Sequence, residues 1–280
     1  MSLDDYELHE EIGRGGMAIV FLATRKKDGA KVAIKQVRPG RSVKSQWNET
    51  LLRFQNEAEI LEKLNAHENI LTIIDMDPSF IATELLTGGT LADAAPHYVG
   101  KYNEAAEIVL AAANSVALAH DVGIIHRDLS IRNIMFRTPP PSPKNLVVTD
   151  FGLAVHWQDT LRLTETGDFL GTLDFASHEQ LQDSKHVAEP TDVFSLGVIL
   201  FKLCSGTFPF RKAPRNTPEQ ALKNREKAKE LSQTCADFGL PACPLELANI
   251  CSRCLVSIEN GRINSMKNLC NDLKNFLCIV

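Results

Sequence analysis

The sequence predicts a two-lobed α+β fold, in which a small strand-rich lobe precedes a larger, mainly helical one. Between residues 6 and 37, apolar and polar residues alternate with the two-residue period of β-strands. Beyond residue 86, long stretches carry apolar residues at helical spacing instead. A chain of 280 residues is long enough for two small lobes that share one cleft. We therefore expect one domain, 1–280, with an N-terminal lobe at 1–86 and a C-terminal lobe at 87–280.

The elements are expected in a simple order along the chain. Three antiparallel strands come first, joined by turns, and Asp28-Gly29 is a typical hairpin pair for one of these turns. An amphipathic helix and two more strands complete the first lobe, and two long helices dominate the second. The expected strands are 6–12, 18–24, 31–37, 70–74 and 79–86, and the expected helices are 47–65, 104–121 and 191–205.

Composition and charge narrow the possible functions. A hydrophobic content of 44% and a charged content of 23% are typical of a soluble globular protein. The net charge of -5 does not suggest the basic surface that nucleic-acid binding requires. No run approaches the ~18 apolar residues of a membrane span, and the acidic start lacks the pattern of a signal peptide. We expect a cytoplasmic protein without nucleic-acid or membrane partners, and its oligomeric state stays open.

The seven cysteines all lie after residue 200. Cys251 and Cys254 form a CxxC pair, which is half of a common zinc site. The alternative is a pair of reduced thiols on a helix. The helical spacing of ICSRCLV, and the lack of a second CxxC or HxxxH pair, favour reduced thiols.

Five motifs with a shared chemistry follow one another. A glycine turn such as IGRGGMAIV (12–20) can bring backbone N–H groups close to phosphate oxygens. The lysine of VAIK (32–35) supplies a cation, and the acidic and amide side chains of HRDLSIRN (126–133) and VTDFGLA (148–154) supply oxygen ligands that suit Mg²⁺. A helix carrying Glu57 lies between them. Each motif is common alone, but the ordered set indicates phosphoryl transfer from a nucleotide.

In this order the motifs resemble those of the protein kinase family, over about residues 6–265. Gly171-Thr172 and the pair Thr164 and Thr166 are similar to features of bacterial, eukaryotic-like Ser/Thr kinases. The resemblance implies a bilobal kinase fold, with a five-stranded antiparallel sheet and one helix in the N-lobe. It also implies ATP and Mg²⁺ as cofactors, proteins with Ser/Thr as substrates, and autophosphorylation of the activation loop.

The resemblance assigns roles to single residues. Lys35 would hold the α- and β-phosphates and pair with Glu57, while Asp128 would accept or orient the substrate hydroxyl. Asn133 and Asp150 would bind Mg²⁺. The residues that would enclose ATP are Ile12, Gly13, Gly15, Gly16, Val20, Ala33, Lys35, Thr83, Glu84, Leu86 and Met135.

Other positions are implied to have structural roles. Asp192 would brace the loop that holds Asp128, and Glu179 would form an ion pair with Arg262. The side chains expected to stack as a column between the lobes are Leu61, Ile73, His126 and Phe151.

Three positions depart from the family pattern. Ala18 occupies the place of the third glycine, and His178 that of a proline. Ser130 stands where Ser/Thr kinases usually carry a lysine that neutralises the transferred phosphate. Arg132, four residues after Asp128, can supply the missing charge, because a guanidinium makes bidentate contacts with phosphate. The alternative is that Arg132 is only a surface cation of the loop.

Two other functions remain open. A pseudokinase scaffold would explain Ala18, Ser130 and His178, although none of the expected catalytic ligands is missing. A small-molecule kinase of related fold shares the lobes and a similar loop. The DFG motif and Gly171-Thr172 favour a protein kinase over this last class.

Overall fold

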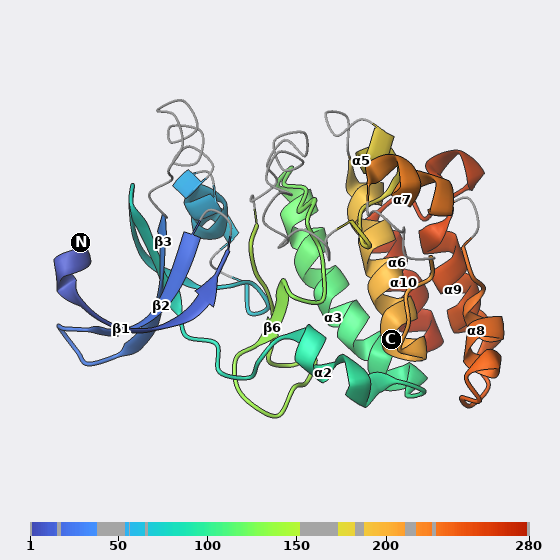
Figure 1. The fold of residues 1–280 in the computed structure, drawn as a ribbon, viewed down its shortest axis with the longest axis horizontal. Coiled ribbons are helices and arrows are strands. Elements are labelled where there is room, and N and C mark those ends of the chain that lie inside the picture. The colour runs from blue at the N-terminus through green and yellow to red at the C-terminus, as the bar shows by residue number, and fades with distance from the viewer. Residues whose placement is uncertain are drawn as a thin grey trace.

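A computed structural model describes residues 2–15, 18–37, 54–55, 57–64, 67–151, 173–182, 188–210, 217–225 and 228–278. The described part of the chain forms two lobes, with a sheet at one end and a stack of helices at the other (Figure 1). This arrangement confirms the predicted two-lobed α+β fold.

The first lobe is built on a five-stranded antiparallel sheet with the strand order β1-β2-β3-β5-β4. Its elements are η1 (Leu3–Asp5), β1 (Tyr6–Arg14), β2 (Ala18–Arg25), β3 (Lys31–Val37), β4 (Ile73–Asp77) and β5 (Phe80–Glu84). The predicted hairpin turn is present, and Gly29 there has a φ of 73°, which favours glycine.

The fourth strand begins later than the sequence predicted. It starts at Ile73 rather than at residue 70, because Ile70 forms an isolated parallel bridge with Val148 of the second lobe. The N–H of Val148 also donates to the carbonyl of Asn69 at 3.0 Å. The segment before β4 therefore attaches the sheet to the second lobe.

Alternation along β3 decides which side chains face the other lobe. Val32 and Ile34 are fully buried in a small core on one side of the sheet, together with Phe80. Because successive residues of a strand point to opposite faces, Ala33 and Lys35 lie on the other face.

The helix of the first lobe packs beneath the sheet. Residues 57–64 are helical, and Ala58, Leu61 and Leu64 are buried at its inner face, as the amphipathic pattern predicted. The rest of the predicted helix 47–65, apart from residues 54 and 55, lies outside the described residues.

The second lobe is mainly helical around the buried helix α6. Its elements are α2 (Leu91–Tyr98), α3 (Tyr102–Asp121), β6 (Ile134–Phe136), β7 (Leu146–Val148), α5 (His178–Gln182), α6 (Glu189–Ser205), α7 (Pro218–Arg225), α8 (Leu231–Asp237), α9 (Leu245–Leu255), η4 (Ile258–Asn260) and α10 (Met266–Phe276). The large core around α6 extends to Leu61 and Ile73 of the first lobe. None of the helices that the structure describes is long and apolar enough to cross a membrane.

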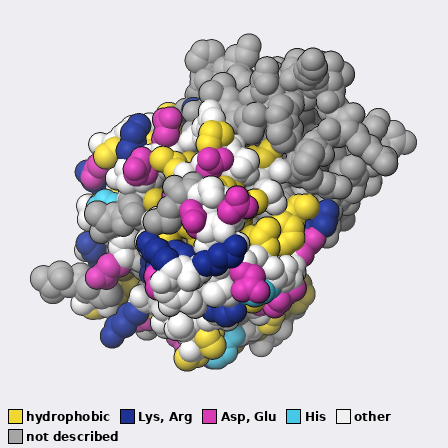
Figure 2. All heavy atoms as spheres, turned by 90° about the vertical axis from the view of Figure 1, so that its left-hand side faces the viewer, with side chains coloured by type: hydrophobic (Ala, Val, Ile, Leu, Met, Phe, Trp, Pro, Cys, Tyr) yellow, Lys and Arg dark blue, Asp and Glu magenta, His cyan; other side chains and the backbone are white. Residues whose placement is uncertain are grey.

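Figure 2 shows the face at the N-lobe end of the molecule. Over its described part, acidic and basic side chains are interspersed with hydrophobic ones, and neither sign of charge dominates. An ion pair on this lobe illustrates the pattern: both nitrogens of the Arg25 fork donate to the carboxylate of Asp28.

Candidate active site

Three charged side chains from separate elements meet on the inner face of the sheet. Lys35 on β3 extends its ammonium nitrogen to within 2.6 Å of Oε1 of Glu57 and 2.7 Å of Oδ1 of Asp150. Glu57 comes from the helix of the first lobe, and Asp150 follows β7 of the second. The expected contact between Lys35 and Glu57 is therefore present, and the same ammonium group also connects the two lobes.

Burial and the neighbouring charges shift the pKa values of these three side chains in opposite directions. Burial alone would lower the pKa of Lys35, but the charges of Asp150 and Glu57 outweigh it and leave that pKa raised. Burial raises the pKa of Glu57 to about 7 against the effect of Lys35, and its Oε2 has no hydrogen-bond partner among the described residues. The pKa of Asp150 is lowered, because Lys35 outweighs the effect of burial. Lys35 and Asp150 are thus both charged at neutral pH, whereas Glu57 is partly protonated there.

The backbone of the loop 126–133 is hydrogen-bonded to the buried side chain of Asp192. Its Oδ2 accepts from the backbone N–H of His126 at 2.8 Å, and its Oδ1 accepts from that of Arg127 at 2.9 Å. Nε2 of His120 on α3 donates to the same carboxylate at 2.8 Å. Arg127 has a φ of 64°, a sparsely populated conformation that these bonds support. The predicted bracing role of Asp192 is confirmed, whereas the part of His120 was missed.

Asp128 and Asn133 face each other across this loop. Nδ2 of Asn133 donates to the carbonyl oxygen of Asp128 at 2.7 Å and to its Oδ2 at 3.2 Å. Oδ1 of Asp128 is buried and has no hydrogen-bond partner among the described residues. Burial, followed by the charge of Asp150, raises the pKa of Asp128 to about 7. An unpaired buried carboxylate oxygen is suited to accept a proton from a hydroxyl group near neutral pH.

The same residues fit a magnesium ion. Asn133 uses its amide nitrogen toward Asp128, which leaves its carbonyl oxygen for a metal. Asp150 supplies a carboxylate that is ionised at neutral pH, as its lowered pKa shows. Hard oxygen donors of this kind, few in number and close to a phosphate site, are what Mg²⁺ binds in phosphotransferases.

Ser130 and Arg132, in the same loop, differ in how much of their side chains is exposed to water. The Ser130 side chain is buried, and its Oγ accepts from the backbone N–H of Arg132 at 3.2 Å. Ser130 thus stabilises a turn of the loop. Arg132 has an exposed side chain, so its guanidinium is free to extend toward a bound substrate or toward water.

Most residues expected around the nucleotide lie along adjacent strands. Val20 on β2 pairs with Gly13 on β1 and with Lys35 on β3, and Ala33 pairs with Thr83 on β5. Ala33 and Thr83 are buried, whereas Ile12 is 47% exposed at the edge of the sheet. Gly15 donates its N–H to the carbonyl of Ala18 at 2.9 Å, which closes the glycine turn, and Gly16 lies outside the described residues.

The remaining nucleotide residues follow β5 or lie on β6. Glu84 is the last residue of β5, and Leu86 follows two positions later. Met135 on β6 is half-buried and forms a bridge with Thr90 at the start of α2. The candidate site thus combines residues from the sheet, from the segment after β5 and from the hairpin of β6 and β7.

The apolar side chains that were expected to form a column between the lobes belong to one buried core. Leu61, Ile73 and Phe151 are buried, and the ring of His126 lies 4.7 Å from that of Phe151. Burial lowers the pKa of His126, and its Nε2 donates to the carbonyl of Thr149 at 2.9 Å. The neutral ring of His126 therefore packs in the core against Phe151, which is the part of the expected column that the structure shows directly.

Farther from the site, Arg262 and Glu179 form the ion pair that the sequence predicted. Nη1 of Arg262 donates to Oε1 of Glu179 at 2.6 Å, and the arginine side chain is fully buried. His178 packs its ring edge-on against Phe194, at a centroid distance of 5.5 Å. The sequence did not indicate Arg225, which stacks on Phe210 and donates to the carbonyl of Leu173.

Cys251 and Cys254 lie on α9, where they pack against Gly197 of α6. Both thiols are buried, and Sγ of Cys251 lies 3.6 Å from the carbonyl oxygen of Gly197. Burial raises the pKa of both thiols, which favours the uncharged, reduced form that the sequence analysis preferred.

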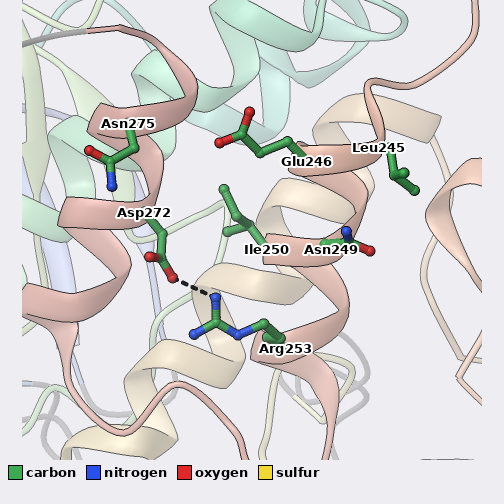
Figure 3. Close-up of a pocket in the computed structure, with 7 residues that line it drawn as sticks. All are labelled: Leu245, Glu246, Asn249, Ile250, Arg253, Asp272 and Asn275. Atoms are coloured by element: carbon green, nitrogen blue, oxygen red, sulfur yellow. Dashed lines mark hydrogen bonds and ion pairs between the residues drawn. The ribbon is translucent and has the colours of Figure 1, made fainter.

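An open hollow of about 450 Å³ lies away from these residues, between α9 and α10 (Figure 3). Arg253 and Asp272 point toward each other across it, and Nη1 lies 2.9 Å from Oδ2. The side chains drawn around them are Leu245, Glu246, Asn249, Ile250 and Asn275. The hollow contains none of the groups expected to act on a phosphate, so the chemistry points to the site at Lys35 and Asp128.

Comparison with known proteins agrees with this geometry. Residues 6–273 match the protein kinase domain. The chain belongs to the protein kinase domain family. A serine/threonine-protein kinase of Corynebacterium efficiens, drp72, is 33% identical over 216 residues, which are 74% of this chain and 40% of that protein.

Other relatives of this kinase domain come from distant organisms. The probable serine/threonine-protein kinase PknB of Lactococcus lactis is 35% identical over 213 residues, which are 74% of the chain and 32% of that protein. Human ribosomal protein S6 kinase alpha-2 is 30% identical over 225 residues, which are 78% of the chain and 29% of that protein. The kinase domain described here therefore spans less than half the length of these relatives.

Proposed function

We propose that this kinase domain transfers the γ-phosphoryl group of ATP to serine and threonine hydroxyls of proteins, with Mg²⁺ as its metal. The observation that carries the proposal is the meeting of Lys35, Asp150, Asn133 and Asp128, which the fold brings from β3 and from two separate loops. The similarity to Ser/Thr kinases of bacteria supports this acceptor class. We also propose that the reaction takes place in the cytoplasm.

The chain's own residues would do most of the work by position and charge. Lys35 would exchange part of its contact with Asp150 for phosphate oxygens, which neutralises their charge and aligns them. Asp128 would orient the acceptor hydroxyl through its unpaired Oδ1 and take up the proton. Mg²⁺, when bound by Asn133 and Asp150, would neutralise further charge on the phosphates.

The activation segment is proposed to be an early substrate of the same reaction. Thr164 and Thr166 are the expected acceptors, with Thr160 a weaker one, and all three lie outside the described residues. Arg127 next to Asp128 has an exposed side chain that is available to pair with a phosphate group.

Incubation of the purified chain with labelled ATP, Mg²⁺ and an unstructured acceptor protein tests the proposal. Label on serine and threonine, lost when Mg²⁺ is chelated, is the expected result. Label on tyrosine alone would contradict the proposed acceptor class. Nucleotide binding without transfer would favour the pseudokinase scaffold, and transfer only to small metabolites would favour the small-molecule kinase.

A further inference from the structure

Arg137, the residue directly after β6, contacts both ends of the segment 84–87. Its Nε lies 2.8 Å from Oε2 of Glu84, and its Nη2 lies 2.9 Å from Oε1 of the same carboxylate. Its carbonyl oxygen accepts from the backbone N–H of Thr87 at 2.9 Å and from the hydroxyl of Thr87 at 3.0 Å. Both ends of the segment between the lobes are thus bonded to the same residue, Arg137.

The same guanidinium also reaches the segment before β4. Nη2 donates to the carbonyl of Ile70 at 3.2 Å, and Nη1 donates to that of Glu68. Oε1 of Glu84 in turn accepts from the backbone N–H of Thr72 at 2.9 Å. Since Ile70 is bridged to β7, Arg137 joins the end of β5 to the segment before β4, which itself contacts the second lobe.

The ion pair is partly shielded from water. The side chains of Arg137 and Glu84 are 27% and 22% exposed. Burial alone would raise the pKa of Glu84, but the bonds from Arg137 and from Thr72 outweigh it and leave that pKa lowered. A planar guanidinium that meets a carboxylate through two bonds also fixes the relative orientation of the groups, which a lysine cannot do.

We propose that Arg137 is a positioning residue that holds the segment 84–87 in the conformation that receives the adenine of ATP. The inference rests on the proposed function, and it further proposes that Glu84 and Leu86, which are among the residues expected to enclose ATP, bind the base through their backbone groups. Backbone groups that are already ordered lose less conformational freedom on binding, so the segment binds the base more tightly. Arg137 therefore sets nucleotide affinity without contacting the nucleotide.

The path of the chain leaves the segment little room to rearrange while these contacts persist. The N–H of Gly88 donates to the carbonyl of Phe136 on β6 at 3.0 Å. A Cβ atom on Gly88 would lie 2.7 Å from Cβ of Phe136, closer than real Cβ contacts allow. Backbone hydrogen bonds hold the end of the segment at Thr87 and Gly88. The Arg137–Glu84 ion pair holds the other end, at Glu84.

Arg137→Met tests the proposal, because it removes the guanidinium and keeps the carbonyl that holds Thr87. We expect the Kd for a fluorescent ADP analogue and the KM for ATP to rise about tenfold, with kcat at saturating ATP within about twofold. Hydrogen exchange should speed up at the N–H groups of Glu84, Thr87 and Gly88, which are bonded in this structure. Arg137→Lys should restore only part of the affinity, since it keeps the charge without the fork.

Arg25→Met is the matched control. It removes a two-bond ion pair that lies wholly within the first lobe, in which Arg25 Nε lies 3.0 Å from Oδ1 of Asp28 and Nη2 lies 2.6 Å from Oδ2. This control should leave nucleotide affinity unchanged. The double variant Glu84→Gln/Arg137→Met should bind the nucleotide as tightly as Arg137→Met alone, because the two side chains form a single contact.

The outcomes separate this inference from the proposed function. An Arg137→Met enzyme with wild-type Kd and KM, or one whose kcat alone falls, would overturn the positioning role. If the wild-type chain binds nucleotide without transfer, the proposed function fails and the Kd still decides the role of Arg137. If it binds no nucleotide, both fail. A loss of affinity in the Arg25→Met control as large as that in Arg137→Met would also overturn the inference.

Discussion

The ammonium nitrogen of Lys35 lies 2.7 Å from Oδ1 of Asp150, although 115 positions separate the two residues in the sequence. Lys35 belongs to the sheet and Asp150 to the loop after β7, so this contact brings a cation of one lobe to a carboxylate of the other. Both groups are expected to bind the triphosphate of ATP, one directly and the other through Mg²⁺. Their contact would therefore place the phosphates at the junction of the lobes.

Lys35→Met should abolish phosphoryl transfer and leave a folded protein. The change removes the cation that aligns the phosphates and leaves Glu57 without its ion pair. Autophosphorylation measured beside a thermal melt provides the test, with Lys31→Met as control, because Lys31 at the start of β3 contacts the side chains of His9 and Thr24 at the surface of the sheet. Transfer at the wild-type rate by the Lys35 variant would refute the site.

The two aspartates should differ in what they control. Asp150→Asn should weaken Mg²⁺-dependent ATP binding, because a carboxylate ligand is lost where the phosphates crowd the metal. Asp128→Asn should leave nucleotide affinity unchanged and lower kcat, because the unpaired Oδ1 acts on the acceptor hydroxyl. Nucleotide titration and saturation kinetics of both variants distinguish these roles. Equal losses of ATP affinity with unchanged kcat would show that the division is wrong.

Features encoded within a short stretch of sequence could be predicted. Loop 126–133 carries Asp128 and Asn133 five positions apart, and both reach the same point of the structure. The alternation of β3 placed Lys35 on the face opposite Ile34 without reference to any other element. The overall two-lobed arrangement followed from the same local periodicities.

Such local patterns could not predict contacts between segments that are distant in the sequence. Nothing near Arg137 in the sequence points to Glu84, 53 positions earlier, because their contact depends on how the β6–β7 hairpin packs on β5. The inward turn of Ser130 was likewise missed: its hydroxyl bonds a backbone N–H, which the residue type permits but does not require. The late start of β4 reflects competition from Val148 for the residues before it.

Arg132→Ala should lower kcat by about 10²-fold, as the loss of a preorganised charge near a transition state commonly does. The exposed guanidinium is free to reach the transferred phosphate, where the buried Ser130 offers no charge. Adding Ser130→Lys should recover part of the loss, although it removes the bond to the N–H of Arg132. Single-turnover kinetics test both steps, and a full-rate Arg132→Ala enzyme would leave Arg132 as a surface cation.

Phosphorylation of Thr164 and Thr166 should raise activity. A phosphate adds roughly two negative charges, which the exposed guanidinium of Arg127 can pair with beside Asp128. Mass spectrometry after incubation with Mg-ATP should find phosphate within residues 158–172, and the Thr164→Ala/Thr166→Ala variant should lose activity. Phosphate found only elsewhere, or full activity of that variant, would count against this switch.

The buried ion pair of Arg262 and Glu179 should matter more for stability than an exposed pair of the same lobe. Glu179→Gln leaves the fully buried Arg262 side chain without its anion, which should lower the free energy of unfolding by roughly 3 kcal/mol. Arg253→Met breaks the exposed pair with Asp272 shown in Figure 3, and it should cost less than about 1 kcal/mol. Urea unfolding of the two variants gives the comparison, and equal losses would contradict it.

The stabilisation by Glu179 should also depend on pH. Burial would raise the pKa of this carboxyl, but the hydrogen bond and charge of Arg262 outweigh it, so the folded-state pKa is lowered. A lowered folded pKa means that the stabilisation is complete above the unfolded value of about 4.3 and is lost as the pH falls through the folded value. The difference in unfolding free energy between wild type and Glu179→Gln should therefore be constant between about pH 6 and 8 and shrink below about pH 4. A difference that instead grew on acidification would mean that Arg262 does not hold Glu179 ionised.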